Sequence, residues 1–167
     1  AACGHFEIVK MLHQIGVPCT NEAMDCAAEM GHLEIVKWLH QNRTEGCTTD
    51  AVDRACEQNE EETVTWLLEN RHEGFTEDAL GLACLHGNLR LLQRLLNMGL
   101  HTVTPNHVDY AAENGHVELV NWVYENYDLR CTSYSIDYAA NNGQFNMIKW
   151  LFKNGATCTQ RAFDNAI

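Results

Sequence analysis

The fold is decided by the stretch Ala-Ala-Glu-Met-Gly-His-Leu-Glu-Ile-Val-Lys, residues 27–37. Two small alanines precede Gly31, and a glycine suits the end of a helix because it adopts positive φ without strain. The segment that follows has apolar residues at positions 33, 35, 36, 38 and 39, which is helical spacing and lacks the alternation of a half-buried strand. The stretch therefore predicts one helix that ends in a tight turn and a second, antiparallel helix.

The same pattern recurs with a period of 28 residues, which indicates an array of helix pairs. Tryptophans mark one column of equivalent positions, with an arginine in the gap: Trp38, Trp66, Arg94, Trp122 and Trp150. A second column holds threonines that can cap the first helix of each repeat: Thr20, Thr48, Thr76, Thr104 and Thr132, with Thr159 at a step of 27. We expect the tryptophans in the core, because they lie on the apolar face of the second helix.

A third column contains aspartates and is interrupted once by a glycine: Asp25, Asp53, Gly81, Asp109, Asp137 and Asp164. A row of equivalent carboxylates does not provide the unequal pKa values that an acid–base pair needs. We therefore interpret the column as structural, with each carboxylate bonded to a loop or amide of the adjoining repeat.

The recurring motif resembles the ankyrin motif, which reads Ala-Ala-x-x-Gly-His-Leu-Glu-hydrophobic-Val, and residues 4–10 and 115–120 repeat it. The resemblance implies an all-α fold, an ankyrin-like α-solenoid of stacked antiparallel helix pairs whose first helices line a concave face. Ankyrin repeats usually run to about 33 residues. With a period of 28, we expect the projecting hairpin to be reduced to a short loop, such as residues 42–46.

This register predicts a single array with five full repeats and a partial repeat at each end. The partial repeats are residues 1–16 and 156–167, and the full repeats are residues 17–43, 44–71, 72–99, 100–127 and 128–155. Solenoids need polar end caps to be soluble, and neither end has one. We therefore expect the chain to be a fragment, or the ordered portion, of a longer array.

The charge balance favours some partners over others. Eleven basic residues against 23 acidic ones give a net charge of -12, which repels phosphate backbones and anionic membrane surfaces, so we expect neither nucleic acid nor a membrane as partner. The acidic cluster within residues 45–62 is either a solvated face or a docking surface for a basic partner. The eight cysteines follow the repeat, so we expect small buried thiols in a reducing, cytoplasmic compartment.

Motifs that carry chemistry are missing from the sequence. There is no Cys-x-x-Cys, no His-Glu-x-x-His, no acidic calcium loop and no glycine-rich phosphate loop. The histidines that follow a glycine, such as His32 and His116, are interpreted as structural residues that bond the backbone nearby. We expect no enzyme activity, no cofactor, no metal site and no small-molecule ligand.

The candidate site consists of first-helix positions that break the periodicity, because irregular residues on a regular scaffold can encode specificity. We predict a protein partner on the concave first-helix face, with tyrosines as leading contacts and with a basic surface if the acidic cluster is a docking surface. The predicted contacts are Arg54, Glu57, Gln58, Leu85, His86, Tyr110, Glu113, Asn114, Tyr134, Tyr138 and Asn141. Two alternatives stay open: a structural spacer, or a regulatory segment of a longer multidomain protein whose activity lies elsewhere.

Overall fold

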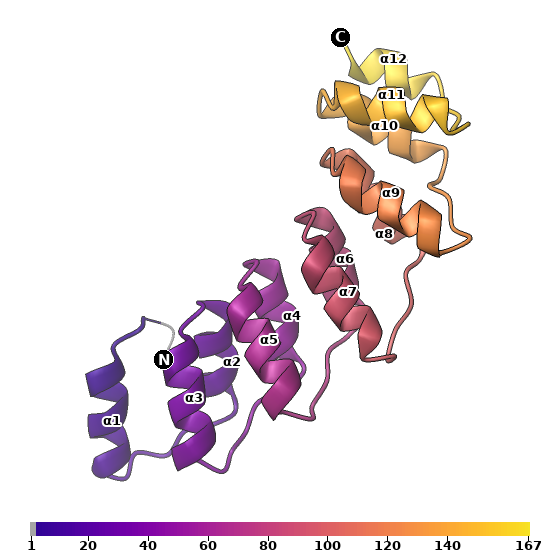
Figure 1. The fold of residues 1–167 in the computed structure, drawn as a ribbon. Helices are drawn as coiled ribbons and strands as arrows, with labels where there is room; N and C mark the ends of the chain where they lie inside the picture. The colour runs from indigo at the N-terminus through magenta and orange to yellow at the C-terminus, as the bar shows by residue number, and fades with distance from the viewer. Residues whose placement is uncertain (1–2) are drawn as a thin grey trace. The chain divides into compact units, whose positions relative to one another are not determined.

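The computed structural model describes residues 3–167, which form twelve helices and no strand (Figure 1). Ala1 and Ala2, which open the predicted first partial repeat, lie outside the described residues. The all-helical, ankyrin-like fold predicted from the sequence is confirmed. Contacts divide the chain into two compact units, residues 1–79 and 80–167. We call these the first unit and the second unit and describe each by itself.

The first unit contains α1 (Phe6–Gln14), α2 (Glu22–Glu29), α3 (Leu33–Asn42), α4 (Asp50–Glu57) and α5 (Glu61–Asn70). The first helices α2 and α4 pack on each other, and each also packs on its own second helix, α3 or α5. Alanines at the contact, such as Ala27 and Ala55, are fully buried and let the two backbones approach closely. Residues 43–49 link α3 to α4 without forming a strand, so the predicted loss of the hairpin is confirmed here, with the loop starting one residue later than expected.

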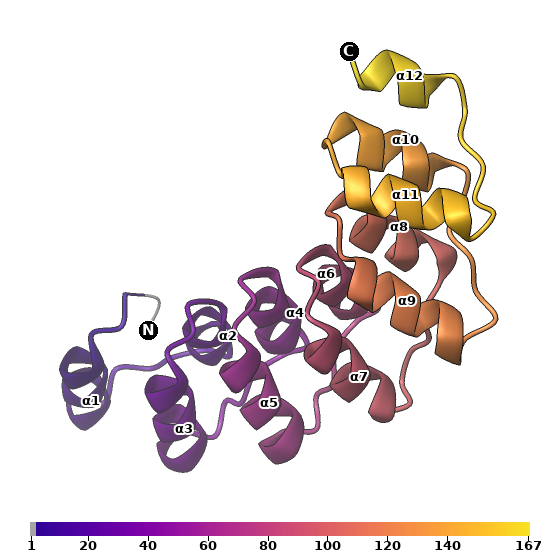
Figure 2. The same ribbon diagram turned by 45° about the horizontal axis from the view of Figure 1, so that its top comes forward.

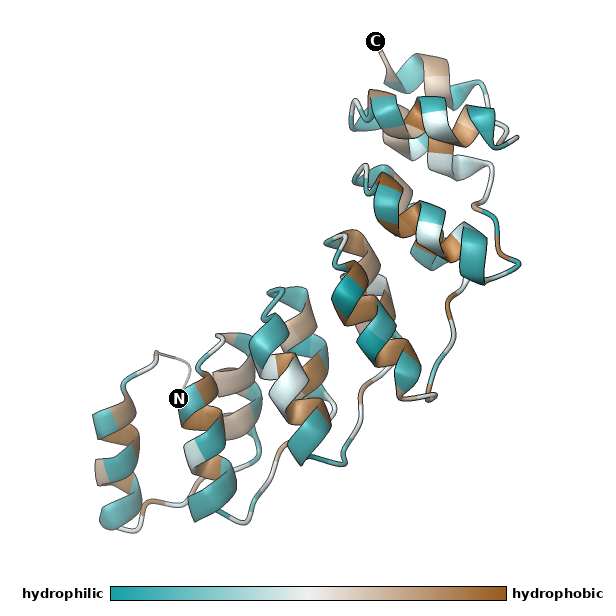
Figure 3. Ribbon diagram, viewed as in Figure 1, coloured by the Kyte–Doolittle hydropathy of each residue, from teal (hydrophilic) through white to brown (hydrophobic). Residues whose placement is uncertain are grey.

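The second unit contains α7 (Leu89–Asn97), α8 (Pro105–Glu113), α9 (Val117–Asn126), α10 (Tyr134–Asn141), α11 (Phe145–Lys153) and α12 (Arg161–Asn165), and α6 (Asp78–Leu85) spans the boundary. The first helices again stack, α8 on α10 and α10 on α12 (Figure 2). The helix pairs carry both hydrophobic and hydrophilic residues (Figure 3). Burial of the hydrophobic ones against neighbouring helices, rather than in one centre, provides the core.

Successive repeats are joined by an aspartate that accepts hydrogen bonds from the threonine at the start of the next repeat. Asp25 accepts from N and Oγ1 of Thr48, both at 2.9 Å, and Asp109 accepts from N and Oγ1 of Thr132 at 2.9 Å and 2.6 Å. Two further rungs of this ladder are Asp53–Thr76 and Asp137–Thr159. Each threonine hydroxyl in turn accepts from the backbone N–H two residues later. The predicted structural role of the aspartate column is confirmed for these four aspartates and stays a prediction for Asp164.

The tryptophans do not lie in the core, and the prediction that placed them there is wrong. All four are half-buried, and three of them, Trp38, Trp66 and Trp150, lie edge-on to a ring of the preceding second helix. Trp66 lies edge-on to His40 with 5.2 Å between ring centroids, and Trp150 lies edge-on to Tyr124 at 5.0 Å. The core of each pair is built instead from smaller aliphatic side chains, such as Val36 and Leu67.

Candidate interaction surface

The predicted contact residues all lie on first helices or at the residue that follows them. Arg54, Glu57 and Gln58 are at α4, and Leu85 and His86 are at α6. Tyr110, Glu113 and Asn114 are at α8, and Tyr134, Tyr138 and Asn141 are on α10. The structure therefore divides them into a group of three in the first unit and a group of eight in the second.

In the first unit, Arg54 is already paired within the molecule. Its guanidinium lies 2.6 Å from a carboxylate oxygen of Asp50, 3.4 Å from Glu22 and 3.7 Å from Glu29. The hydrogen bond to Asp50, together with the nearby charges, raises the pKa of Arg54. A partner that uses Arg54 would have to displace these carboxylates.

In the second unit, three tyrosines expose aromatic surface on neighbouring first helices. Tyr110 on α8 is 44% exposed, and Tyr134 and Tyr138 on α10 are 48% and 45% exposed. The rings of Tyr134 and Tyr138 lie 6.2 Å apart with their planes tilted by 36°. Because α8 packs on α10, the three rings belong to one continuous face, which we call the tyrosine face.

Gly81 lies next to the first of these rings. A Cβ at this position would lie 3.4 Å from Cε2 of Tyr110 and 3.7 Å from Cδ2 of His107. Gly81 stands where the ladder has aspartate, and Thr104 of the next repeat instead donates its N–H to Nδ1 of His107 at 3.3 Å. The sequence showed Gly81 as an exception and Tyr110 as an irregular residue. The sequence did not indicate that Tyr110 packs against Gly81, although both residues depart from the repeat pattern at the same junction.

At several junctions, the glycine that ends a first helix also contacts the next repeat, because a side chain of that repeat packs directly against it. Gly87 has φ +68, and the ring of His116 covers it while Nε2 of His116 bonds the carbonyl oxygen of Leu85 at 2.9 Å. His32 covers Gly4 in the same way. The prediction that these histidines bond the local backbone is wrong for His116, because its ring reaches the backbone of the preceding repeat instead.

Family models match most of the sequence. The model for ankyrin repeats in three copies matches residues 53–134 and 80–162, and the model for ankyrin repeats in many copies matches residues 1–40. The chain belongs to the ankyrin repeat family. A comparison with curated proteins finds no match. Ankyrin repeats are generally protein–protein interaction modules, and proteins built from them are typically non-enzymatic scaffolds.

The first helices that carry or adjoin the tyrosines differ in charge from the last first helix, α12, which contains Arg161. Helices α6, α8 and α10 contain no lysine or arginine, and Glu113 lies one turn after Tyr110 on α8. The basic residues of residues 80–167 are Arg90, Arg94, Arg130, Lys149, Lys153 and Arg161, on α7, α11, α12 or a connecting loop. The tyrosine face is therefore aromatic with an acidic edge.

Within residues 3–167, no group of three or more histidine, cysteine, aspartate or glutamate side chains could hold a metal ion, and no helix is long and apolar enough to cross a membrane. All eight cysteines of this part of the chain are free thiols. Burial raises the pKa of Cys56 and of Cys84 to about 12, so both stay protonated at neutral pH.

Proposed function

We propose that this ankyrin array binds a protein partner on the tyrosine face and that the segment of the partner lying there is basic. The observation that carries the proposal is the set of three half-exposed tyrosines on adjacent first helices, one of them fitted over Gly81. Tyrosine gives a large contact area at low entropic cost, because it has only two rotatable side-chain torsions. Anchors of this type often dominate the energy of an interface.

The basic character of the partner follows from the charges around the face. A lysine or arginine over a tyrosine ring is attracted by its π electrons, and Glu113 adds a carboxylate one turn away. The net charge of -12 accelerates the approach of a basic partner more than it strengthens the final complex. In this proposal the first helices form the concave face that the ankyrin resemblance implies.

The test is a binding measurement with matched variants. Tyr110→Ala with Tyr138→Ala removes two anchors, and Phe145→Ala with Phe152→Ala removes two exposed aromatics from the second helix α11. The probe is a set of lysine- and arginine-containing peptides with neutral peptides of equal length beside it. We expect the parent and the phenylalanine variant to bind basic peptides alike, and the tyrosine variant to bind at least about tenfold more weakly.

Each other outcome rejects part of the proposal. Equal binding by both variants would place the contact away from the tyrosine face. Preference for neutral peptides would reject a basic partner. No binding by the folded parent would favour a spacer.

A further inference from the structure

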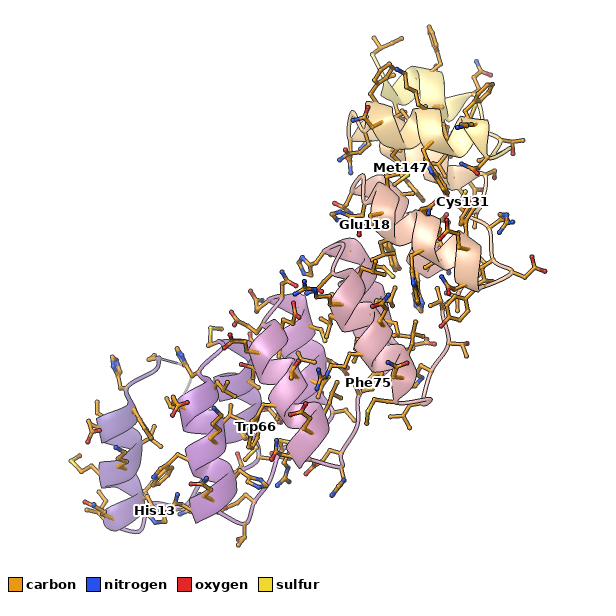
Figure 4. All side chains as sticks on the ribbon, viewed as in Figure 1. His13, Trp66, Phe75, Glu118, Cys131 and Met147 are labelled. Carbon is orange, nitrogen blue, oxygen red and sulfur yellow. The ribbon has the colours of Figure 1, made fainter. Side chains whose placement is uncertain are left out.

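Two seams in the first unit contain the same four side chains. In the seam between α1 and α3, the ring of His13 lies edge-on to Trp38, 5.1 Å between centroids, and Nη1 of Arg43 lies 3.3 Å from Nδ1 of His13. Figure 4 labels one residue of each seam, His13 and Trp66. The seam between α3 and α5 repeats this arrangement with His40, Trp66 and Arg71, at 5.2 Å and 3.1 Å. Glu45 and Glu73 complete the two sets. We call them the histidine seams.

The arginine determines which form of the histidine fits. A guanidinium has donors and no acceptor, so Nδ1 of the imidazole must accept and cannot carry a proton. The seam is therefore built around a neutral imidazole with its proton on Nε2. Histidine side chains ordinarily take up a second proton at about pH 6.5, within reach of physiological change.

We infer that the two histidine seams are an acid-sensitive device: protonation of His13 and His40 removes the acceptor, sets two cations against each other and opens the contacts of α1 with α3 and of α3 with α5. Protonation leaves the covalent structure unchanged and is reversed when the pH rises.

The arginine cannot simply turn away from the charged ring, because a carboxylate holds it. Nε and Nη2 of Arg43 donate to the two oxygens of Glu45 at 3.2 Å and 2.5 Å. Arg71 makes the same two bonds to Glu73. Each carboxylate also accepts the backbone N–H of the residue before it, Thr44 or His72, which holds it in place beside the guanidinium.

The remaining titratable neighbours do not offset the new charge. Cys19 lines the same cavity as His13 and Arg43, and Cys47 lies at Arg71 with a pKa that burial raises to about 11, so it stays neutral. On the histidines' own helices, a lysine stands one turn earlier and pairs with a glutamate. These pairs are Lys10–Glu7 at 2.8 Å and Lys37–Glu34 at 3.3 Å.

Protonation of carboxylates does not mimic the effect in the same pH range. The hydrogen bond from Arg43 lowers the pKa of Glu45 to about 2. For Glu73, burial raises the pKa, but the bonds from Arg71 and from its own backbone outweigh it, and the pKa is lowered. Burial raises the pKa of Asp25, so the folded state takes up this proton more readily than the unfolded chain, and acidification through that range favours folding. Loosening of these contacts on acidification therefore points to the histidines and not to these carboxylates.

The second unit contains a natural counterpart that does not titrate in acid. Tyr124 occupies the position equivalent to His40 and lies edge-on to Trp150 at 5.0 Å. The seam between α9 and α11 therefore keeps the aromatic contact without the imidazole, and it serves as a control within the same molecule.

The experiment compares the 167-residue chain with a His13→Asn, His40→Asn variant by hydrogen exchange at about pH 7.5 and about pH 5.5, each corrected for the intrinsic exchange rate. The asparagine oxygen can accept in place of Nδ1 and does not titrate. We expect exchange in α1 and α3 of the parent to rise about tenfold per seam on acidification, corresponding to loss of one hydrogen bond to a charged donor. Helices α9 and α11 of the parent, and α1 and α3 of the variant, should be unaffected.

Unchanged protection of α1 and α3 in the parent, or the same loss in the variant, would overturn the inference. If the variant folds poorly, nitrogen NMR of the imidazoles in the parent provides an independent test. At about pH 7.5 it should show His13 and His40 protonated on Nε2 alone. A proton on Nδ1, or doubly protonated rings with the seams intact at low pH, would equally reject the device.

Discussion

Replacing Gly87 by alanine tests whether the glycines of this array are required by their neighbours as well as by their backbone angles. Gly87 has φ +68, and a Cβ there would overlap the imidazole of His116, which covers the glycine from the next repeat. Gly99 has the same φ, +68, but an added Cβ there meets no atom within 4 Å. Both positions lie in the second unit, so Gly99→Ala is a matched control.

The magnitude follows from separating the two costs. Alanine in the left-handed region costs about 1–2 kcal/mol, and both variants bear this cost. Gly87→Ala must also push His116 away and break its 2.9 Å bond to the carbonyl of Leu85, which adds about 1–3 kcal/mol. We therefore expect a loss of about 2–5 kcal/mol for Gly87→Ala against about 1–2 kcal/mol for Gly99→Ala.

The assay is urea unfolding followed by tryptophan fluorescence, since Trp122 and Trp150 both report on the second unit. The free energies of unfolding of parent and variants are compared at equal slope, because a changed slope would signal a loss of cooperativity. Equal destabilisation by the two substitutions would refute the reasoning, since it would mean that the close approach of His116 contributes nothing.

Two further predictions concern the ladder and the thiols. Asp109→Ala removes the carboxylate that accepts from the N–H and hydroxyl of Thr132, and it should lower the free energy of unfolding in urea by about 2–4 kcal/mol. Asp53→Ala should lower it by less, because Asp53 bonds a more exposed threonine, Thr76. The reverse order would contradict the ladder as described. In the native protein at neutral pH, Cys84 should resist alkylation because burial raises its pKa to about 12, whereas the exposed Cys158 should react. Mass spectrometry of the labelled peptides measures both rates, and early labelling of Cys84 would contradict the prediction.

The sequence predicted the helix pairs because the signals that form them are local and repeated. Gly31 ends one helix, and the apolar spacing after it starts the next, whatever the neighbouring repeats contain. The role of the aspartate column was also predictable, since a periodic ladder of carboxylates has to serve a periodic purpose. Asp25 and Asp109 do so by binding the threonine of the following repeat.

Other features depend on how repeats meet, which periodicity alone does not describe. Trp66 has the spacing of a core residue, yet its ring is only half-buried and lies edge-on to His40 of the preceding repeat. The fit of Tyr110 over Gly81 joins residues from two repeats, and the residue pattern of either repeat gives no hint of it. The predicted repeat boundaries and the predicted contact residues stay predictions.

The aspartate–threonine ladder has a consequence for how such a gene can change length. Asp25 precedes its threonine, Thr48, by 23 residues, and Asp53 precedes Thr76 by the same interval. Deleting residues 48–75 in frame would place Asp25 ahead of Thr76 by the same interval of 23 residues, so the aspartate–threonine hydrogen bonds could form at the new junction. Unequal recombination between neighbouring repeats can thus add or remove one helix pair without leaving a mismatched joint, and the array can be inherited in different lengths while each junction remains the same.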